Sequence, residues 1–247
     1  MDETILSEGS RLAAYFAFPS VGSAAVPGLV LCHGFPRGPR GAASSAATYP
    51  ELADRVAREA GWAALAFNFR GTGTSEGDFS IAAWRADLRA AVRALGQRTA
   101  GVWVAGMAEG GALALCEAAA DPEVGGVATL ATPASFQDWV RNPGRLLQLA
   151  RGVGMVRTAG FPTDAGAWGR EVGTLDPLAC ARALAPRPLL VLHGTDDDVV
   201  APDAARALCD AAGSTAELHL VQGAGHRLRH DPRAVAALLG WLERQTP

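Results

Sequence analysis

The sequence predicts a single α/β domain built on a mostly parallel sheet with helices on both faces. Three observations predict it. The length of 247 residues suits one domain with a large core. Hydrophobic residues make up 49% of the chain and charged residues 19%, which favours a globular over a disordered protein. Short apolar segments alternate with longer amphipathic ones, and this alternation is typical of a parallel sheet covered by helices.

The apolar segments give the expected strands. They are Leu12–Phe18, Gly28–Cys32, Trp62–Phe69, Gly101–Ala105, Val124–Leu130, Leu189–Leu192 and Leu218–Val221. Thr48-Tyr49-Pro50-Glu51 has the form of a capping box and predicts a helix that ends near Ala60. Trp84, Leu88, Val92 and Leu95 share one face of a second helix by their spacing. Further helices are expected over Gly110–Ala120, from Pro202 and from Asp231.

The segment between Pro133 and Pro186 has helical patches but no clear strand. We therefore expect residues 134–185 to form a small helical lid, inserted in the single domain of residues 1–247 and packed over the strand ends. Its arginines outnumber its carboxylates; they are Arg141, Arg145, Arg151, Arg157 and Arg170 against Asp138, Asp164 and Glu171. These arginines indicate either a surface for an anionic or carrier-bound substrate or a solvated charged face, and the solvated face is the commoner case.

The segment from Gly106 to Gly110 carries the decisive motif. An apolar strand enters Gly106-Met107-Ala108-Glu109-Gly110 and leaves at once into a helix, which is the context of the nucleophile elbow G-x-S-x-G. The central residue is Ala108, which offers no nucleophile. A literal match, Gly73-Thr74-Ser75-Glu76-Gly77, follows its strand at a distance and leads into no apolar helix. Ser75 is therefore expected to be a loop or capping residue.

An acid and a histidine follow in the expected order. Asp197 comes just after the strand Leu189–Leu192, within a run of three aspartates, and His226 stands in a glycine loop after Leu218–Val221. In such an arrangement a carboxylate orients the histidine, which accepts the proton of a nucleophile. Upstream, His33-Gly34-Phe35 ends another strand, where a backbone N–H can help to bind an oxyanion.

Together these motifs resemble a small bacterial-type serine hydrolase of the α/β-hydrolase superfamily, of the esterase, thioesterase or peptidase kind, over almost the whole chain. The resemblance implies the α/β-hydrolase fold. It implies that Asp197 rather than Asp196 or Asp198 is the triad acid, that His226 is the base, and that Ala108 occupies the nucleophile position. It further implies that the backbone N–H groups of Phe35 and Glu109 form the oxyanion hole. The Glu109 side chain is expected to point away from the apex of the turn.

Composition narrows the other possibilities. The net charge of −3 predicts no nucleic-acid partner, and all basic residues are arginine, which excludes a lysine Schiff base. The four cysteines form no C-x-x-C pair and are expected to be buried free thiols. There is no signal-peptide pattern and no apolar run long enough for a membrane span. We expect a cytoplasmic protein without cofactor or bound metal; its oligomeric state is open, and a homodimer is compatible with such folds.

Two hypotheses account for Ala108. In the first, alanine replaces the serine of an ester, thioester or amide hydrolase, and the chain is an inactivated variant. In the second, alanine is natural, and the protein is a non-covalent His/Asp catalyst of the lyase, isomerase or cyclase type, or binds a ligand or partner. The first is favoured, because everything else that acyl transfer needs is in place. A small-molecule acyl substrate is expected as the partner, with Met107, Trp139, Phe161 and Trp168 as candidate pocket residues.

Overall fold

The computed structural model describes residues 1–20, 26–37, 41–44 and 48–245, and within them it contains one sheet of eight strands. The strands are β1 Asp2–Ser7, β2 Ser10–Ala17, β3 Gly28–Cys32, β4 Ala63–Phe67, β5 Val102–Met107, β6 Val124–Leu130, β7 Leu189–Gly194 and β8 Ala216–Val221. Their order across the sheet is β1-β2-β4-β3-β5-β6-β7-β8. The pairs β1–β2 and β2–β4 are antiparallel, and all other pairs are parallel.

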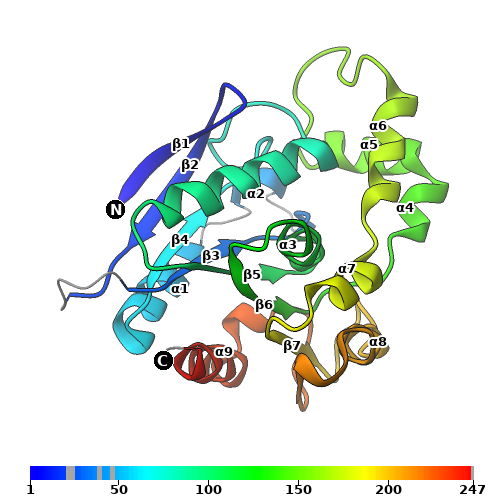
Figure 1. Cartoon of the computed structure of the whole chain (residues 1–247). Helices are drawn as coiled ribbons and strands as arrows, with labels where there is room; N and C mark the ends of the chain where they lie inside the picture. Colours follow the sequence, from blue (N-terminus) through cyan, green and yellow to red (C-terminus); the bar gives the residue numbers. More distant parts are fainter. Residues whose placement is uncertain (21–25, 38–40, 45–47, 246–247) are drawn as a thin grey trace.

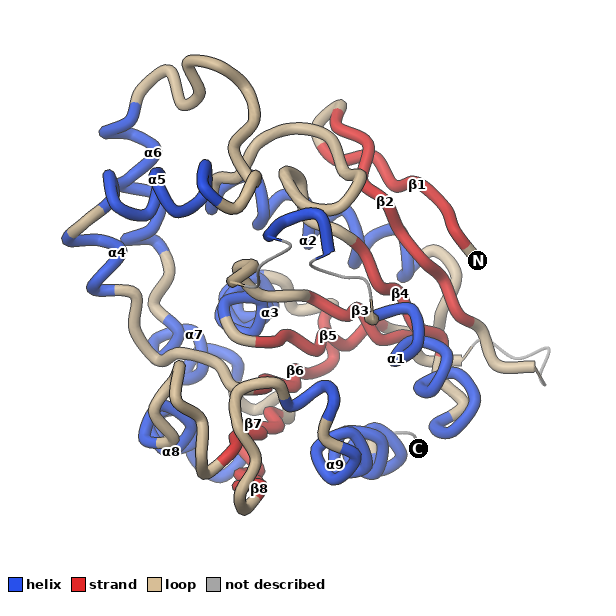
Figure 2. The backbone as a smooth tube through the Cα atoms, turned by 180° about the vertical axis from the view of Figure 1, so that it is seen from behind, coloured by secondary structure: helices blue, strands red, loops and turns tan. Residues whose placement is uncertain are grey.

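Helices cover both faces of this sheet (Figures 1 and 2). They are α1 Tyr49–Arg55, α2 Ile81–Gly96, α3 Glu109–Ala120, α4 Gln137–Arg141, α5 Pro143–Gly152, α6 Ala165–Glu171, α7 Pro177–Leu184, α8 Asp203–Ala212 and α9 Pro232–Arg244. The helices α1 and α9 pack on one face, and α2, α3 and α8 pack on the other. The predicted α/β-hydrolase fold is confirmed.

Alternate residues along each central strand enter two separate cores. In β3, for example, Leu29 and Leu31 pack with Trp241 of α9, whereas Val30 packs on the other face with Trp84 of α2. All of these side chains are buried. A strand that is buried on both faces needs a continuous apolar run, and this is why the segment Gly28–Cys32 is apolar at every position.

The strand β1 is absent from the sequence prediction. It pairs with β2 at the edge of the sheet, and its exposed residues alternate with Ile5 and Ser7. An edge strand needs only one apolar face, so its mixed composition gave a weak signal. The predicted capping box is also wrong. The Thr48 side chain makes no capping hydrogen bond and instead accepts one from Arg229, and α1 passes at Arg55 into one wider helical turn over Val56–Ala60.

The segment expected to form a lid contains α4, α5, α6 and α7. Helix α7 packs between α3 and α8 as part of the helical layer. The helices α4, α5 and α6 lie together beyond the end of α2 (Figures 1 and 2). Buried side chains of this segment, Leu146, Met155 and Trp168 among them, join the core on the α2 side. That the segment works as a lid stays a prediction.

All four cysteines lie in the described part of the chain and are free. Cys32 and Cys116 are buried as expected, whereas Cys180 and Cys209 are only half-buried because they lie on the outer helices α7 and α8. Burial raises the pKa of the Cys32 thiol far above its ordinary value, which keeps this thiol protonated.

Candidate active site

The turn between β5 and α3 is one of the most crowded parts of the backbone. A Cβ atom on Gly106 would lie 2.3 Å from the carbonyl oxygen of Gly110, and one on Gly110 would lie 2.4 Å from that of His33. Only glycine fits at both positions, because backbone atoms cannot move aside as a flexible side chain can. The spacing of these two glycines, which marked the motif in the sequence, therefore follows from the close approach of three chain segments.

Ala108 stands at the apex of this turn with φ 49° and ψ −121°. Its N–H donates to the Leu130 carbonyl at 2.8 Å, and its own carbonyl accepts the Gly111 N–H at 3.0 Å. A non-glycine residue in such a conformation is strained, at a cost of order 1–3 kcal/mol. Alanine thus keeps an unfavourable backbone geometry that presents its side chain at the carboxyl end of the sheet.

Asp197 and His226, predicted as an acid–base pair, are in direct contact. The His226 ring donates from Nδ1 to Asp197 Oδ2 at 2.9 Å, which leaves Nε2 able to accept a proton. Asp197 Oδ1 also accepts the N–H groups of Val199 and Val200, both at 2.9 Å. The Asp197 side chain is fully buried, and that of His226 is 21% exposed.

These hydrogen bonds keep Asp197 ionised. Burial disfavours the carboxylate, but the Val200 N–H, the His226 ring and the Val199 N–H outweigh it and lower the pKa of Asp197 below its ordinary value. A second imidazole also approaches this carboxylate: His193 Nε2 lies 3.2 Å from Asp197 Oδ2 and 2.9 Å from the Val200 carbonyl, to which it donates. Two imidazole rings therefore lie close to the same carboxylate oxygen.

His33, expected to be structural, is buried beneath the predicted oxyanion loop. Its Nδ1 donates to the Gly34 carbonyl at 2.8 Å, and its Nε2 accepts the Phe69 N–H at 3.2 Å. Burial lowers the pKa of His33 to about 4, so the ring is neutral near pH 7. The neutral ring therefore links the Gly34 carbonyl to the backbone at Phe69.

The Glu109 side chain was expected to point away from the apex of the turn, and this expectation is wrong. The side chain lies against the loop of Gly34 and Phe35. Its Oε2 accepts the Phe35 N–H at 2.9 Å, and its Oε1 forms an ion pair with Arg37 at 2.5 Å. A Cβ atom on Gly34 would lie 2.9 Å from both Glu109 Oε2 and the Ala108 Cβ, which shows how closely these groups approach. The Phe35 N–H, predicted as an oxyanion donor, is therefore occupied by a carboxylate of the protein itself.

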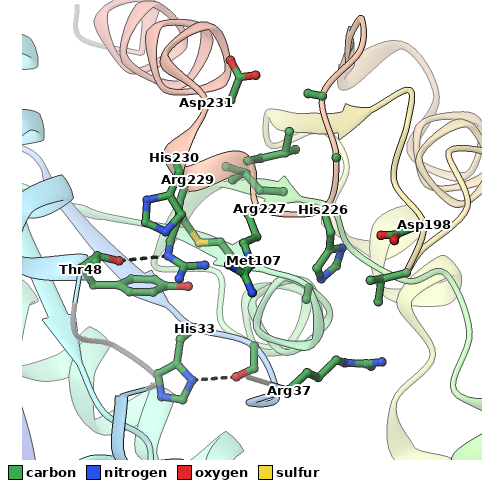
Figure 3. Close-up of a pocket in the computed structure, with 18 of the residues that line it drawn as sticks. His33, Arg37, Thr48, Met107, Asp198, His226, Arg227, Arg229, His230 and Asp231 are labelled. Atoms are coloured by element: carbon green, nitrogen blue, oxygen red, sulfur yellow. Dashed lines mark hydrogen bonds between the residues drawn. The ribbon is translucent and has the colours of Figure 1, made fainter. Parts of the chain in front are cut away.

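Several residues of this region border a pocket of about 1220 Å³ (Figure 3). Ala108, His226, Phe35 and Met107 all line it, as the sequence predicts for a site at the carboxyl edge of the sheet. The pocket is further lined by residues that the sequence analysis did not single out, namely Arg37, Tyr49, Arg227, Arg229 and His230. Nothing in their local sequence marked them as pocket residues, because their places around the pocket depend on how segments distant in the sequence come together.

The other predicted pocket residues lie outside this lining. Trp139 packs edge-on against Phe35, with the two ring centres 5.3 Å apart. Trp168 is buried and donates from its indole N–H to the Phe79 carbonyl. Phe161 is partly buried against the core. Their aromatic surface is used to attach the helices α4 and α6 to the domain rather than to line the pocket.

Three further residues considered in the sequence analysis make structural contacts. Ser75, as expected, is not near the elbow: its hydroxyl accepts the Ala13 N–H and donates to the Asn68 carbonyl, which ties a loop to β2. In the predicted lid, Arg151 and Arg157 donate to the carbonyls of Phe161 and Ser75. These two arginines therefore make hydrogen bonds within the protein.

Two negative findings concern the described residues alone. They contain no group of three or more His, Cys, Asp or Glu side chains that could bind a metal ion. They also contain no helix with the length and apolar character needed to cross a membrane.

Comparison with known proteins identifies the class. Residues 29–238 match the model of the alpha/beta hydrolase family, and the chain belongs to that family. No curated protein matches the sequence.

Solved structures of hydrolases have the same architecture. Est1E from Butyrivibrio proteoclasticus is similar with a TM-score of 0.74 and 18% identity, over 99% of this chain and 98% of that one. A serine-to-alanine mutant of the meta-cleavage product hydrolase from Pseudomonas fluorescens, complexed with acetates, has a TM-score of 0.70 and 18% identity over 98% and 97%. The proline iminopeptidase of Mycobacterium smegmatis has a TM-score of 0.69 and 18% identity over 99% and 98%. At such identities the similarity establishes the fold.

Proposed function

We propose that this site is that of a hydrolase of esters, thioesters or amides in which Ala108 stands at the nucleophile position. The observation that carries the proposal is the hydrogen-bonded pair of Asp197 and His226 in the same pocket as Ala108, which keeps the strained apex conformation. A buried carboxylate that orients an imidazole, placed beside a sharp strand–turn–helix, is the arrangement by which serine hydrolases activate their nucleophile.

With serine at position 108, the reaction would follow from these contacts. The serine Oγ attacks the substrate carbonyl carbon, and His226 Nε2 accepts the hydroxyl proton, which it then gives to the leaving group. Asp197 stabilises the imidazolium through Nδ1. The Glu109 N–H, at the first position of α3, has no preceding helical turn to accept it and is one donor for the oxyanion. The Phe35 N–H is the second donor, once the Glu109 carboxylate releases it.

The chain with Ala108 lacks the atom that forms the acyl-enzyme. Loss of one member of a triad costs about 10⁴–10⁶-fold in kcat, and residual catalysis comes from the oxyanion donors and binding alone. We therefore expect this protein to bind an acyl substrate and to turn it over very slowly. The structurally similar meta-cleavage product hydrolase, crystallised as a serine-to-alanine mutant with acetates, provides a precedent for such a protein that retains ligand binding.

The test is a comparison of this chain with its Ala108→Ser variant. Both are assayed with short- and medium-chain p-nitrophenyl esters and with a fluorophosphonate probe that labels active serines. Ala131→Ser is a matched control, because Ala131 is also a buried alanine with positive φ (52°) next to the sheet edge, but outside the elbow. We expect hydrolysis and labelling for Ala108→Ser only, and their loss in the Ala108→Ser/His226→Ala double variant. A folded Ala108→Ser protein that neither hydrolyses nor labels would overturn the proposal.

One observation favours a second candidate, a non-covalent reaction or ligand binding by the chain with Ala108. Glu109 occupies the Phe35 N–H, so a charged group of the protein already stands where an oxyanion would bind. A site of this kind suits proton transfer by His226 better than acyl transfer. Turnover by the Ala108 protein that His226→Ala abolishes, with binding unchanged, would support this candidate; binding that is unaffected by His226→Ala, without turnover, would indicate a ligand-binding protein.

A further inference from the structure

The short turn that follows His226 places two arginines in the pocket. Leu228 is buried and packs on the α9 side of the sheet, which fixes the turn. Arg227 and Arg229, on either side of Leu228, both line the pocket together with His226. In the view of Figure 3, Arg227 is drawn between Arg229 and His226.

Arg229 is held in place by neutral groups. Its Nε donates to the Thr48 hydroxyl at 3.1 Å, and its guanidinium carbon lies 5.4 Å from the centre of the buried Tyr49 ring. A guanidinium has five N–H donors, and this contact with Thr48 uses one of them. The contacts with Thr48 and Tyr49 orient the guanidinium of Arg229 in the pocket lining. Arg227 lines the same pocket and is the more exposed of the two arginines.

Neither guanidinium forms an ion pair with a carboxylate of the described chain. The nearby carboxylates have other roles: Glu109 is bound by Arg37, and Asp231 is bound by Arg233 at 2.7 Å. Asp198 also lines the pocket, but in Figure 3 it lies beyond His226, away from both arginines. Within the described chain, the positive charges of Arg227 and Arg229 on this side of the pocket are thus not neutralised by an ion pair.

The effect of this charge is visible on a neighbour. Burial and the positive charges of Arg229 and Arg227 lower the pKa of His230, against the weaker opposing effect of Glu51. Like charges that share a pocket repel one another, and an anion bound between them removes this repulsion. Guanidinium groups also match the planar, two-oxygen geometry of carboxylates and phosphates.

We propose that Arg227 and Arg229 form a subsite for an anionic group of the substrate, a carboxylate or a phosphate, beside His226 and Ala108. The substrate class is then an acyl compound that carries a second, anionic group. This deepens the proposed function and rests on it for the acyl part, whereas anion binding itself needs no nucleophile.

Binding to the chain with Ala108 tests the subsite without any reaction. Isothermal titration calorimetry would compare glutarate, inorganic phosphate and the neutral diamide of glutarate. The variants are Arg227→Gln and Arg229→Gln; Arg206→Gln, an exposed arginine on α8 outside the pocket, is the control. We expect glutarate or phosphate to bind and the diamide not to bind. The affinity should fall about tenfold or more in Arg227→Gln, as for the loss of a charge-assisted hydrogen bond, and should be unchanged in Arg206→Gln.

The two anions distinguish the two ligand chemistries. Preference for glutarate assigns a carboxylate, and preference for phosphate assigns a phosphate ester. Arg229→Gln could perturb the fold through Thr48, so its thermal melting is measured as well; Arg227 has no such contact, and its variant decides the matter. Binding that is equal for the diamide and the anions, absence of anion binding, or an equal loss in Arg206→Gln would each overturn the subsite.

A second measurement uses the Ala108→Ser background. The ratio of kcat/KM for mono-p-nitrophenyl glutarate to that for p-nitrophenyl butyrate should fall about tenfold with Arg227→Gln, since only the first ester offers a carboxylate to this arginine. Anion binding without any hydrolysis by Ala108→Ser would keep the subsite and overturn the proposed acyl chemistry. Hydrolysis with an unchanged ratio would overturn the subsite and keep the acyl chemistry.

Discussion

Replacement of Asp197 should destabilise the protein much more than replacement of its acidic neighbours, Asp196 and Asp198. Replacement of Asp197 by alanine removes the acceptor of three hydrogen bonds, from the N–H groups of Val199 and Val200 and from His226. A buried donor left without a partner costs about 1–3 kcal/mol. Since His226 is partly exposed and can turn to water, the two backbone donors dominate, and we expect a loss of about 3 kcal/mol.

For a chain of 247 residues, each kcal/mol shifts the melting temperature by about 2–4 °C. Asp197→Ala should therefore melt about 6–12 °C below the parent chain in differential scanning calorimetry. Asp198 and Asp196 are exposed, and the side chain of Asp196 accepts a hydrogen bond from the neighbouring Thr195 hydroxyl, so their alanine variants should stay within about 0.5 kcal/mol of the parent. Equal melting temperatures for the three variants would refute the assignment of Asp197.

The pH dependence gives a second check on the same carboxylate. The pKa of Asp197 in the folded protein lies below its ordinary value of 3.8. Its stabilising contribution is therefore fully present above that value and is lost as the pH falls through the lower, folded-state pKa. The difference between the parent chain and Asp197→Ala should shrink in this acidic range. A difference that stays constant down to the acid transition would contradict the charged state inferred for Asp197.

Three further predictions follow from the same region. The pKa of His33 falls from 6.5 in the unfolded chain to about 4 in the folded protein. The free energy of unfolding should therefore decrease by about 3 kcal/mol between pH 7 and 4. Urea unfolding over this pH range checks this, and His33→Asn should remove that part of the pH dependence. Gly106→Ala should destabilise the protein by more than about 3 kcal/mol or prevent folding, since the new Cβ meets backbone atoms. In Gly144→Ala, in helix α5, the new Cβ meets nothing within 4 Å, and this variant should be more stable by up to about 1 kcal/mol. Equal melting temperatures for the two variants would contradict this. In the Ala108→Ser background, Glu109→Gln should raise kcat at least about tenfold, because a neutral amide releases the Phe35 N–H more easily than a carboxylate. This increase is part of the effect of one oxyanion donor. An unchanged kcat would show that Glu109 does not compete with the substrate oxyanion for this N–H.

The central strands and the order of the motifs could be predicted because their causes are local. Gly28–Cys32 and Val124–Leu130 were predicted with the observed bounds, since a strand buried on both faces needs a continuous apolar run, which is visible in the sequence itself. The elbow could be placed because a strand, two glycines and a helix follow one another without interruption. Resemblance selected Asp197 among three aspartates, and in the structure it is Asp197 that contacts His226.

The remaining features depend on contacts that are distant in the sequence. The Arg229 contact with Thr48 spans 181 positions, and it overrode the local capping signal of Thr48. The Glu109 contact with Phe35 spans 74 positions, so helix geometry at the elbow could not reveal it. Aromatic residues of the segment 134–185 were expected in the pocket because apolar side chains near a site are ambiguous: Trp168 instead fills the core beside Phe79.

The conformation of Ala108 has a consequence for how such a protein changes over generations. The turn is set by the crowding of Gly106 and Gly110 and by the hydrogen bond to Leu130, none of which involves the side chain at position 108. Codons for alanine and serine differ in many cases by a single base. A hydroxyl group at this apex can thus be gained or lost in one mutational step, with no rearrangement of the backbone. Under the function proposed above, one such step would convert a site that only binds its substrate into one that hydrolyses it, or the reverse, on the same backbone.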